Sequence, residues 1–413
     1  SSLQSIREDT IDRQIARYID RDDIVTTVAS TFLSTTAHCA RCHDHKFDPI
    51  TQKEFYQLFA YFNSINEYGL LLSTEIVPTP SLLLPNEEQA QKLKELSVKS
   101  YGTKAALKRV LATTEERFAK WEKGGERFTP YHSVFTLDEY NEGFEDTGDV
   151  RPKALARKLG SVAEVEGKKG KAVTFDGENG IAFKGLGARE RWEAFTWAFW
   201  LSDPRSIGPV VLLHRTGGTD VGFCGFDLML EDGFLTARVM RHWPGNALAI
   251  RSNERLAKDA WQHLTWSWDG SGDASGLRLY LNGKELAMTI LVDKLWKSIA
   301  AYGDHASSGG DWCFGQRFRD SGFKGGKVDE IDFILDELTP QQVEDIYLGR
   351  RPDLDNRRVQ FDTYDQERLQ AQRFMRNAQE ELASYENRIA EISVMEEAKP
   401  EIPAYVLARG DYD

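Results

Sequence analysis

Two cysteines and a histidine stand in the order C-x-x-C-H at Cys39, Cys42 and His43 of a chain that has only four cysteines in 413 residues. Two thiols at this spacing can add to the two vinyl groups of a haem, and the histidine that follows directly can ligate the iron. The same side chains are also zinc ligands, and two close thiols can act as a redox-active dithiol. The spacing leaves haem c, a zinc or dithiol site, and a purely structural turn open.

A haem at this motif would need a sixth iron ligand, which the neighbouring residues do not clearly supply. His45 is only two residues from His43 and would struggle to reach the opposite face of a haem. The other nearby donors are His38 and Lys46, and no methionine precedes Met229. We therefore expect a five-coordinate iron, or a sixth ligand from another part of the protein.

Zinc is the alternative cofactor for this segment, with Cys39, Cys42 and one of the histidines as ligands. Structural zinc sites usually draw on two ligand pairs, and no second pair is present. The fourth ligand would have to be His38 or Asp48. His45 is accordingly an alternative metal ligand.

Aromatic and acidic residues further along the chain indicate a ligand site of another kind. Trp243 stands in "RHWPGN", and Asp311 and Trp312 stand in "GGDWCFG". An exposed indole can stack on a sugar, and loop carboxylates can take sugar hydroxyls or calcium. The sequence leaves open whether these three residues bind a ligand from exposed loops or are purely structural, and we find no catalytic constellation around them.

The other two cysteines, Cys224 and Cys313, lie far apart in strand-like surroundings. A disulfide between them in an oxidising compartment and two buried free thiols both fit the sequence.

Helical patterns flank the motif and recur at two places further along. Residues 1–70 show apolar residues at helical spacing on both sides of the cysteines, and 71–85 reads as an extended linker. Residues 86–125 and 355–397 each predict one long charged helix with a narrow apolar stripe, the second ending in Ile389 and Ile392. Because neither helix should be stable alone, we expect them to pair antiparallel.

Between these helices, residues 130–350 alternate in the manner of short β-strands. Asp232-Gly233 and Asn282-Gly283 are typical of two-residue hairpin turns, since both residues tolerate positive φ. Thr339 to Gln342 forms a capping box with proline at the first helical position, which predicts one short helix at the end of the zone. The zone therefore predicts an all-β sandwich.

Charge and hydropathy exclude some classes of protein. The net charge of −13 argues against a nucleic-acid partner, which would require clustered Lys and Arg. No apolar run approaches the roughly 20 residues needed to span a bilayer. The first residues carry no export signal and look cut from a longer chain, so any localisation signal would lie elsewhere.

The β zone resembles the laminin-G-like, concanavalin A-like jelly roll. The resemblance rests on four stretches in the family's order: "AVTFDGENGIAF", "FTWAFWLSDP", "WQHLTWSWDGSGDASGLRLYLNGKEL" and "FKGGKVDEIDFILDELTPQQVEDIY". Members of this family often bind glycans, sometimes with calcium, so the resemblance implies a carbohydrate or a cell-surface protein as partner.

The first zone resembles the end of the planctomycete cytochrome c-type domain. The stretch "RDDIVTTVASTFLSTTAHCARCHDHKFDPITQKEFYQLFAYFNS" matches that family in its helix and through C-A-R-C-H-D-H-K-F-D-P. The last residues, 398–413, resemble the lead-in to the domain that follows in this family. The resemblance implies an interior portion of a larger, exported protein, periplasmic or extracellular, whose flanking domains lie outside this chain.

Taken together, the patterns predict a multidomain α + β protein. A small helical cytochrome c-like segment precedes an antiparallel helical hairpin into which the jelly-roll sandwich is inserted. The resemblance implies haem attached at Cys39 and Cys42, with His43 on the iron, for electron transfer or as a redox component of a larger oxidoreductase. The competing hypothesis is a non-redox binding protein whose C-x-x-C-H segment is structural or holds zinc.

Overall fold

The computed structural model describes residues 13–66, 76–124, 135–136, 155–184, 186, 188–204, 208–218, 221–300, 311–317, 322–349 and 357–411. The chain divides into two compact units. Unit 1 comprises Ser1–Leu82, Thr219–Gly222 and Glu391–Asp413, and unit 2 comprises Leu83–Gly218 and Phe223–Ala390. None of the helices among the described residues is both long and apolar enough to cross a membrane.

Unit 1 is built on helices α1 (Arg13–Phe32) and α2 (Gln52–Asn63), with the short 3₁₀ helix η1 (Ala37–Arg41) between them. Their shared core consists of Val25, Ala29, Ala37, Ala40, Phe55, Tyr56 and Phe59. Helix α2 begins with a capping box, in which the Thr51 side chain accepts the Glu54 amide and Glu54 accepts the Thr51 amide. The strands β1 (Ser81–Leu84) and β18 (Ala390–Ser393) form a two-stranded sheet, and η4 (Ala408–Gly410) ends the described chain.

The two predicted long helices of unit 2 are each broken into two. The first is α3 (Glu87–Ala112) and α4 (Thr114–Gly124), and the second is α6 (Arg357–Tyr364) and α7 (Gln366–Glu386). The prediction that the second helix runs to residue 397 is wrong, because α7 ends at Glu386 and residues 390–393 form β18.

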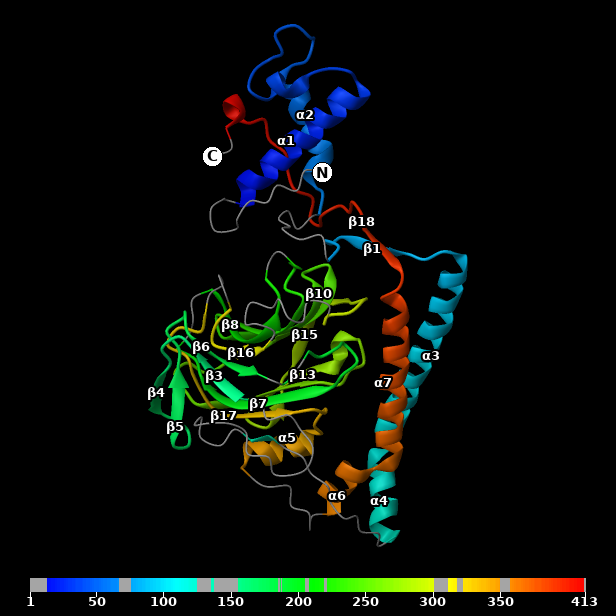
Figure 1. Ribbon diagram of the computed structural model, residues 1–413, viewed down its shortest axis with the longest axis vertical. Helices are drawn as coiled ribbons and strands as arrows, with labels where there is room; N and C mark the ends of the chain where they lie inside the picture. The colour runs from blue at the N-terminus through cyan, green and yellow to red at the C-terminus, as the bar shows by residue number, and fades with distance from the viewer. Residues whose placement is uncertain are drawn as a thin grey trace. The chain divides into compact units, whose positions relative to one another are not determined.

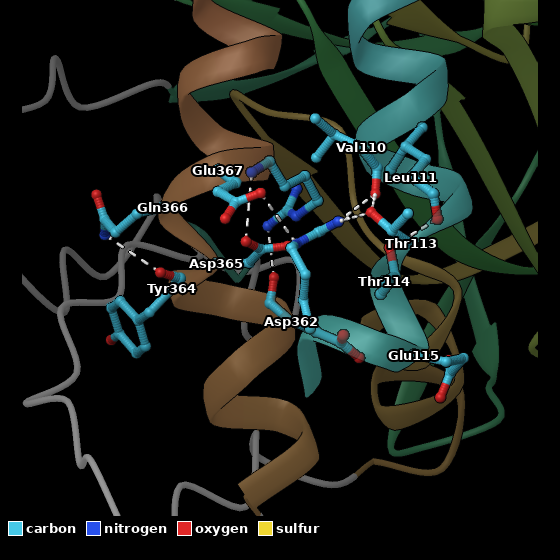
Figure 2. Close-up of polar contacts among 12 residues, drawn as sticks. Val110, Leu111, Thr113, Thr114, Glu115, Asp362, Tyr364, Asp365, Gln366 and Glu367 are labelled. Atoms are coloured by element: carbon cyan, nitrogen blue, oxygen red, sulfur yellow. Dashed lines mark hydrogen bonds and ion pairs between the residues drawn. The ribbon is translucent and has the colours of Figure 1, made fainter. Parts of the chain in front are cut away.

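Helices α3 and α7 lie side by side and antiparallel, as the sequence predicted (Figure 1). Near the middle of α3, Ser100 accepts a hydrogen bond from Gln379 at 2.8 Å. Beyond the end of α3, Arg117 pairs with Asp365, which precedes α7. Arg117 also donates to the Thr113 hydroxyl at 2.8 Å, so the helix break on one side faces the break on the other (Figure 2).

The rest of unit 2 is a sandwich of two antiparallel sheets. The first, called here the β8 sheet, has the order β15 (Met288–Lys294), β11 (Asn246–Ser252), β10 (Phe234–His242), β9 (Gly225–Glu231), β8 (Pro209–Thr216), β16 (Trp312–Phe314), β6 (Gly180–Lys184) and β3 (Leu155–Leu159). The second, the β12 sheet, has the order β14 (Lys284–Glu285), β13 (Leu277–Leu281), β12 (Gln262–Trp268), β7 (Phe195–Ser202), β17 (Lys327–Ile334), β5 (Lys171–Thr174) and β4 (Ala163–Glu166), with β2 (Phe135–Thr136) beside β17.

Aromatic side chains fill the space between the sheets. Trp197, Trp266, Trp268 and Trp312 are fully buried there. The hairpin predictions are confirmed: Asp232 and Gly233 join β9 to β10, and Asn282 and Gly283 join β13 to β14, all four at positive φ. Within this core Trp266 packs edge to face against Phe195, with ring centres 5.1 Å apart, and such pairs add to the stability that their buried area already provides.

The predicted capping box is also confirmed, at the start of α5 (Pro340–Tyr347). This helix packs on the outer face of the β12 sheet, where Val343 and Leu338 contact Tyr280 and Ile334. The pair α3 and α7 contacts the sandwich through Lys104, whose amine lies 2.7 Å from Asp273, and through Arg376, 2.6 Å from Asp336. Cys224 and Cys313 are both buried and free, so the alternative of a disulfide between them is not realised.

Candidate functional site: the C-x-x-C-H turn

The C-x-x-C-H motif lies on η1 and the turn that follows it. Ala37 and Ala40 point into the unit 1 core, whereas Cys39 and Cys42 are exposed. The turn is closed by the Cys42 amide, which donates to the Cys39 carbonyl at 3.3 Å. Both thiols are free, so both are available to react with a molecule from solution.

His43 is exposed, and its ring orientation is set by its neighbour. Its Nδ1 lies 2.8 Å from the carbonyl oxygen of Asp44, which can only accept a hydrogen bond. The proton therefore belongs on Nδ1, and Nε2 is left with its lone pair. This is the arrangement by which proteins orient a histidine that ligates a metal through Nε2.

His45, in contrast to His43, uses its Nδ1 as a hydrogen-bond acceptor, and its ring is buried against the protein. Its side chain is only 6% exposed, and its Nδ1 accepts the Asp48 amide at 2.9 Å. The Asp48 carboxylate lies 3.3 Å from the same Nδ1 and accepts the Thr35 hydroxyl at 3.3 Å. His45 thus stabilises the loop through Nδ1, and its role as an alternative metal ligand stays a prediction.

The remaining acidic residue of the motif caps the next helix. Asp44 accepts the backbone amide of Gln52 at 2.8 Å, at the first turn of α2. The side chain of Gln52 in turn donates to the carbonyl of Arg41 at 2.9 Å. The residues on both sides of the Cys42-His43 pair, Arg41 and Asp44, are therefore hydrogen-bonded to Gln52, the first residue of α2.

Buried polar contacts anchor the base of the turn. The Tyr56 hydroxyl donates to the carbonyl of Arg41 at 3.2 Å, and the Arg41 guanidinium lies 3.1 Å from the buried Asp22 carboxylate. Burial, with a smaller contribution from Asp22, raises the pKa of Tyr56 to about 12. Tyr56 therefore stays protonated and remains a hydrogen-bond donor to the turn.

The C-terminal segment also reaches the motif, which local sequence patterns did not predict. Gln52 donates to the carbonyl of Leu407 at 3.1 Å, and Asn63 donates to that of Ile402 at 2.7 Å. At Gly410, where φ is +72°, an added Cβ would lie 2.8 Å from the sulfur of Cys42. The sequence signal for this segment was the family resemblance of residues 398–413, and that resemblance did not predict a contact with the motif.

No group of three or more His, Cys, Asp or Glu side chains comes together as a metal site within the described ranges. A tetrahedral zinc site needs such a group. Of the donors considered for zinc, the two thiols and His43 are exposed, whereas the His45 side chain is buried against its loop.

The three residues predicted to bind a ligand in the sandwich differ in their exposure. Trp312 lies in β16 and is fully buried, so the expectation that it is an exposed loop residue is wrong. The Asp311 side chain is 13% exposed and lies 3.6 Å from Arg157. Trp243 is half-buried, with the Arg238 guanidinium 4.6 Å from its ring centre, and is the one of the three that keeps an accessible ring.

Comparisons with known families confirm both resemblances. Residues 2–67 match the family described as PSCyt2, protein of unknown function (DUF1549). Residues 175–344 match Laminin_G_3, of the concanavalin A-like lectin/glucanases superfamily. The chain thus joins a planctomycete cytochrome-like region to a concanavalin A-like sandwich. The comparison with curated proteins gives no match.

Several solved structures are similar to part of the chain. The binding domain of Paraclostridial Mosquitocidal Protein 1 is 17% identical with a TM-score of 0.38, over 52% of each chain. The binding domain of botulinum neurotoxin serotype G is 12% identical with a TM-score of 0.38, over 52% of this chain and 50% of that one. The match therefore spans about half of either solved chain, and at these scores it carries no argument about ligands.

Proposed function

We propose that unit 1 attaches a haem c through Cys39 and Cys42, with His43 as an iron ligand, and that the chain serves electron transfer in an exported protein. The observation that carries the proposal is the His43 ring, whose Nδ1 is engaged by the Asp44 carbonyl beside two exposed free thiols. A bound haem would supply one-electron redox chemistry.

The chain's own residues have separate parts in this proposal. The thiols would hold the group covalently, and the Asp44 carbonyl would orient His43 so that Nε2 faces the iron. Phe47, 83% exposed on the same loop, offers apolar surface for a macrocycle to cover. Export to the periplasm or beyond is proposed from the family resemblance, since covalent haem attachment takes place there.

The test is a visible spectrum of the chain made in a host with haem-attachment machinery. We expect a c-type pyridine haemochrome that disappears in Cys39→Ala/Cys42→Ala and persists in the control Cys224→Ala/Cys313→Ala. His43→Ala should keep some attached haem but change its spectrum, because the thioether bonds do not need the imidazole. Colourless, folded protein with stoichiometric zinc would overturn the proposal in favour of the zinc alternative.

A second part of the proposal concerns the sandwich, which we expect to bind a saccharide or a cell-surface protein. The observation that favours it is the half-buried Trp243 ring beneath the Arg238 guanidinium. An array of oligosaccharides probed with the intact chain tests this part. Binding with no haem in the same protein would instead support the non-redox binding protein.

A further inference from the structure

A second accessible tryptophan lies on the outer face of the β12 sheet. Along β7, Trp197, Phe199 and Leu201 point into the core, so Trp200 points to the opposite face. Trp200 is only half-buried, in contrast to the fully buried Trp197. Packing in the core therefore does not explain why a large aromatic side chain stands at position 200.

Two further rings border Trp200. His263 lies directly opposite on β12, with ring centres 5.3 Å apart and the planes at 68°. Tyr347, the last residue of α5, lies 5.8 Å from Trp200 and 5.8 Å from His263 by the same measure. The three rings form a patch between α5 and the strands beneath it.

His263 carries a polar atom that the fold does not use. Its side chain is almost completely buried, at 2% exposure, and its Nδ1 has no hydrogen-bond partner among the described residues. Burial lowers the pKa of His263 to about 4, so the ring is neutral at pH 7. An unpaired buried polar atom costs free energy, which a ligand beside it can recover.

A cation covers the patch from the hairpin between β4 and β5. Two of its lysines pair with carboxylates: Lys169 with Glu330 at 3.3 Å, and Lys171 with Glu164 at 3.2 Å. Lys168 has no such partner in the described part of the chain, and its exposed amine lies 4.5 Å from the centre of the Trp200 ring.

One acidic residue of the sheet also stands beside Trp200. Asp329 lies opposite Trp200 on β17, and its carboxylate accepts the amides of Lys169 and Glu330, each at 2.9 Å. Its charge is thus directed to the backbone of the hairpin and β17. The half-buried Trp200 indole and the exposed Lys168 ammonium above it remain accessible, and the neutral His263 imidazole lies buried beside the indole.

We propose that Trp200, Lys168 and His263 form a binding site for an acidic saccharide. The Lys168 amine would move off the indole to pair with the carboxylate of the ligand, so that the apolar face of a pyranose could stack on Trp200 and a hydroxyl could reach the now buried Nδ1 of His263. This inference rests on the proposal that the sandwich binds a saccharide, and places the site away from Trp243.

The test measures binding of the intact chain to oligogalacturonates and glucuronate-containing heparan oligosaccharides, with neutral cello-oligosaccharides for comparison. We expect acidic probes to bind better than neutral ones, and Lys168→Ala and Trp200→Ala each to weaken binding at least tenfold. The matched control is Lys169→Ala, on the same hairpin and with the same charge, which should change binding less than twofold. Because Lys168 is exposed, its variant tests the site without a risk of unfolding.

Two results would overturn the inference, and they differ in whether the proposal that the sandwich binds a saccharide also fails. If an acidic probe binds but only Trp243→Ala weakens it, the site is wrong and saccharide binding by the sandwich stands. If none of the probes binds the wild-type chain, the site and the saccharide proposal both fail. The haem proposal is untouched by either result, because its spectrum is measured separately.

Discussion

Asp227 in the β8 sheet offers a sharp test of how this sandwich is held together. Its carboxylate is completely buried and accepts hydrogen bonds from two arginines: Arg238, at 2.6 Å through Nε, and Arg317, at 2.7 Å through Nη1. Both guanidinium groups are themselves almost fully buried. Asp227→Ala would leave two buried cations without this shared counter-charge.

The size of the effect follows from the burial. Removing one partner of a buried ion pair costs about 3–5 kcal/mol, because the remaining charge stays desolvated. Two arginines share this carboxylate, so we expect Asp227→Ala to reach the upper end of that range. The control is Glu231→Ala on the same strand, whose exposed side chain lies 3.5 Å from Arg251 and should contribute at most about 1 kcal/mol.

The assay is chemical unfolding followed by tryptophan fluorescence. All ten tryptophans lie between Trp121 and Trp312, so the signal reports unit 2 alone. If Asp227→Ala and Glu231→Ala lower the free energy of unfolding equally, the arginines do not depend on the buried carboxylate and the reasoning is refuted.

The same residue predicts a pH dependence. Burial by itself would raise the pKa of Asp227, but Arg238 and then Arg317 outweigh it and hold that pKa below the ordinary 3.8. A lowered pKa in the folded state means that the stabilisation is complete above about pH 4 and is lost as the pH falls through the folded value. The acid limb of the stability curve should therefore be shallower in Asp227→Ala than in the wild type.

Three further changes test other parts of the structure. Gly410→Ala should lower the free energy of local unfolding of the C-terminal segment by about 1–2 kcal/mol, since an L residue is strained at φ +72° and its Cβ would meet the Cys42 sulfur. Unchanged hydrogen exchange over 402–411 would contradict this. Thr339→Ala should cost about 1 kcal/mol in the fluorescence assay through loss of the capping box, and Thr339→Ser should restore most of it. Burial raises the pKa of Cys224 and of Cys313 to about 12, so iodoacetamide at pH 8 should label only the two exposed cysteines until denaturant is added; early labelling of all four would show that the burial is wrong.

Features set by neighbouring residues were predictable from the sequence. The turns at Asp232-Gly233 and Asn282-Gly283 follow from two residues that tolerate positive φ, and the start of α5 follows from one capping box. That Cys39 and Cys42 bind a haem or a metal stays a prediction, although their closeness follows directly from the C-x-x-C spacing. The alternating strands already predicted a β-sandwich, and the family resemblance added its concanavalin A-like type, which depends on contacts far apart in sequence.

Features set by distant partners were not predictable in the same way. Ile389 and Ile392 continue an apolar repeat, yet the helix ends before them because residues 390–393 pair with β1 at the other end of the insertion. Trp312 stands among glycines and looked like a loop residue, but its three-residue strand is inserted between β6 and β8. In both cases the deciding hydrogen bonds come from residues outside the local window.

Unit 1 combines segments that lie far apart in the sequence, which predicts an order of folding. Closing a flexible loop of about 300 residues costs about 5 kcal/mol by (3/2)RT ln n, and a loop of about eight residues costs about 2 kcal/mol. The antiparallel pair α3 and α7 brings the two ends of the inserted chain to the same end of unit 2, so a folded unit 2 leaves only the shorter closure. We therefore expect unit 2 to fold before the C-terminal segment completes unit 1. Pulsed hydrogen exchange during refolding should show protection at β12 before Asn66, whose amide bonds to the Glu396 carbonyl at 2.7 Å. Simultaneous or reversed protection would mean that unit 1 closes without help from the insertion.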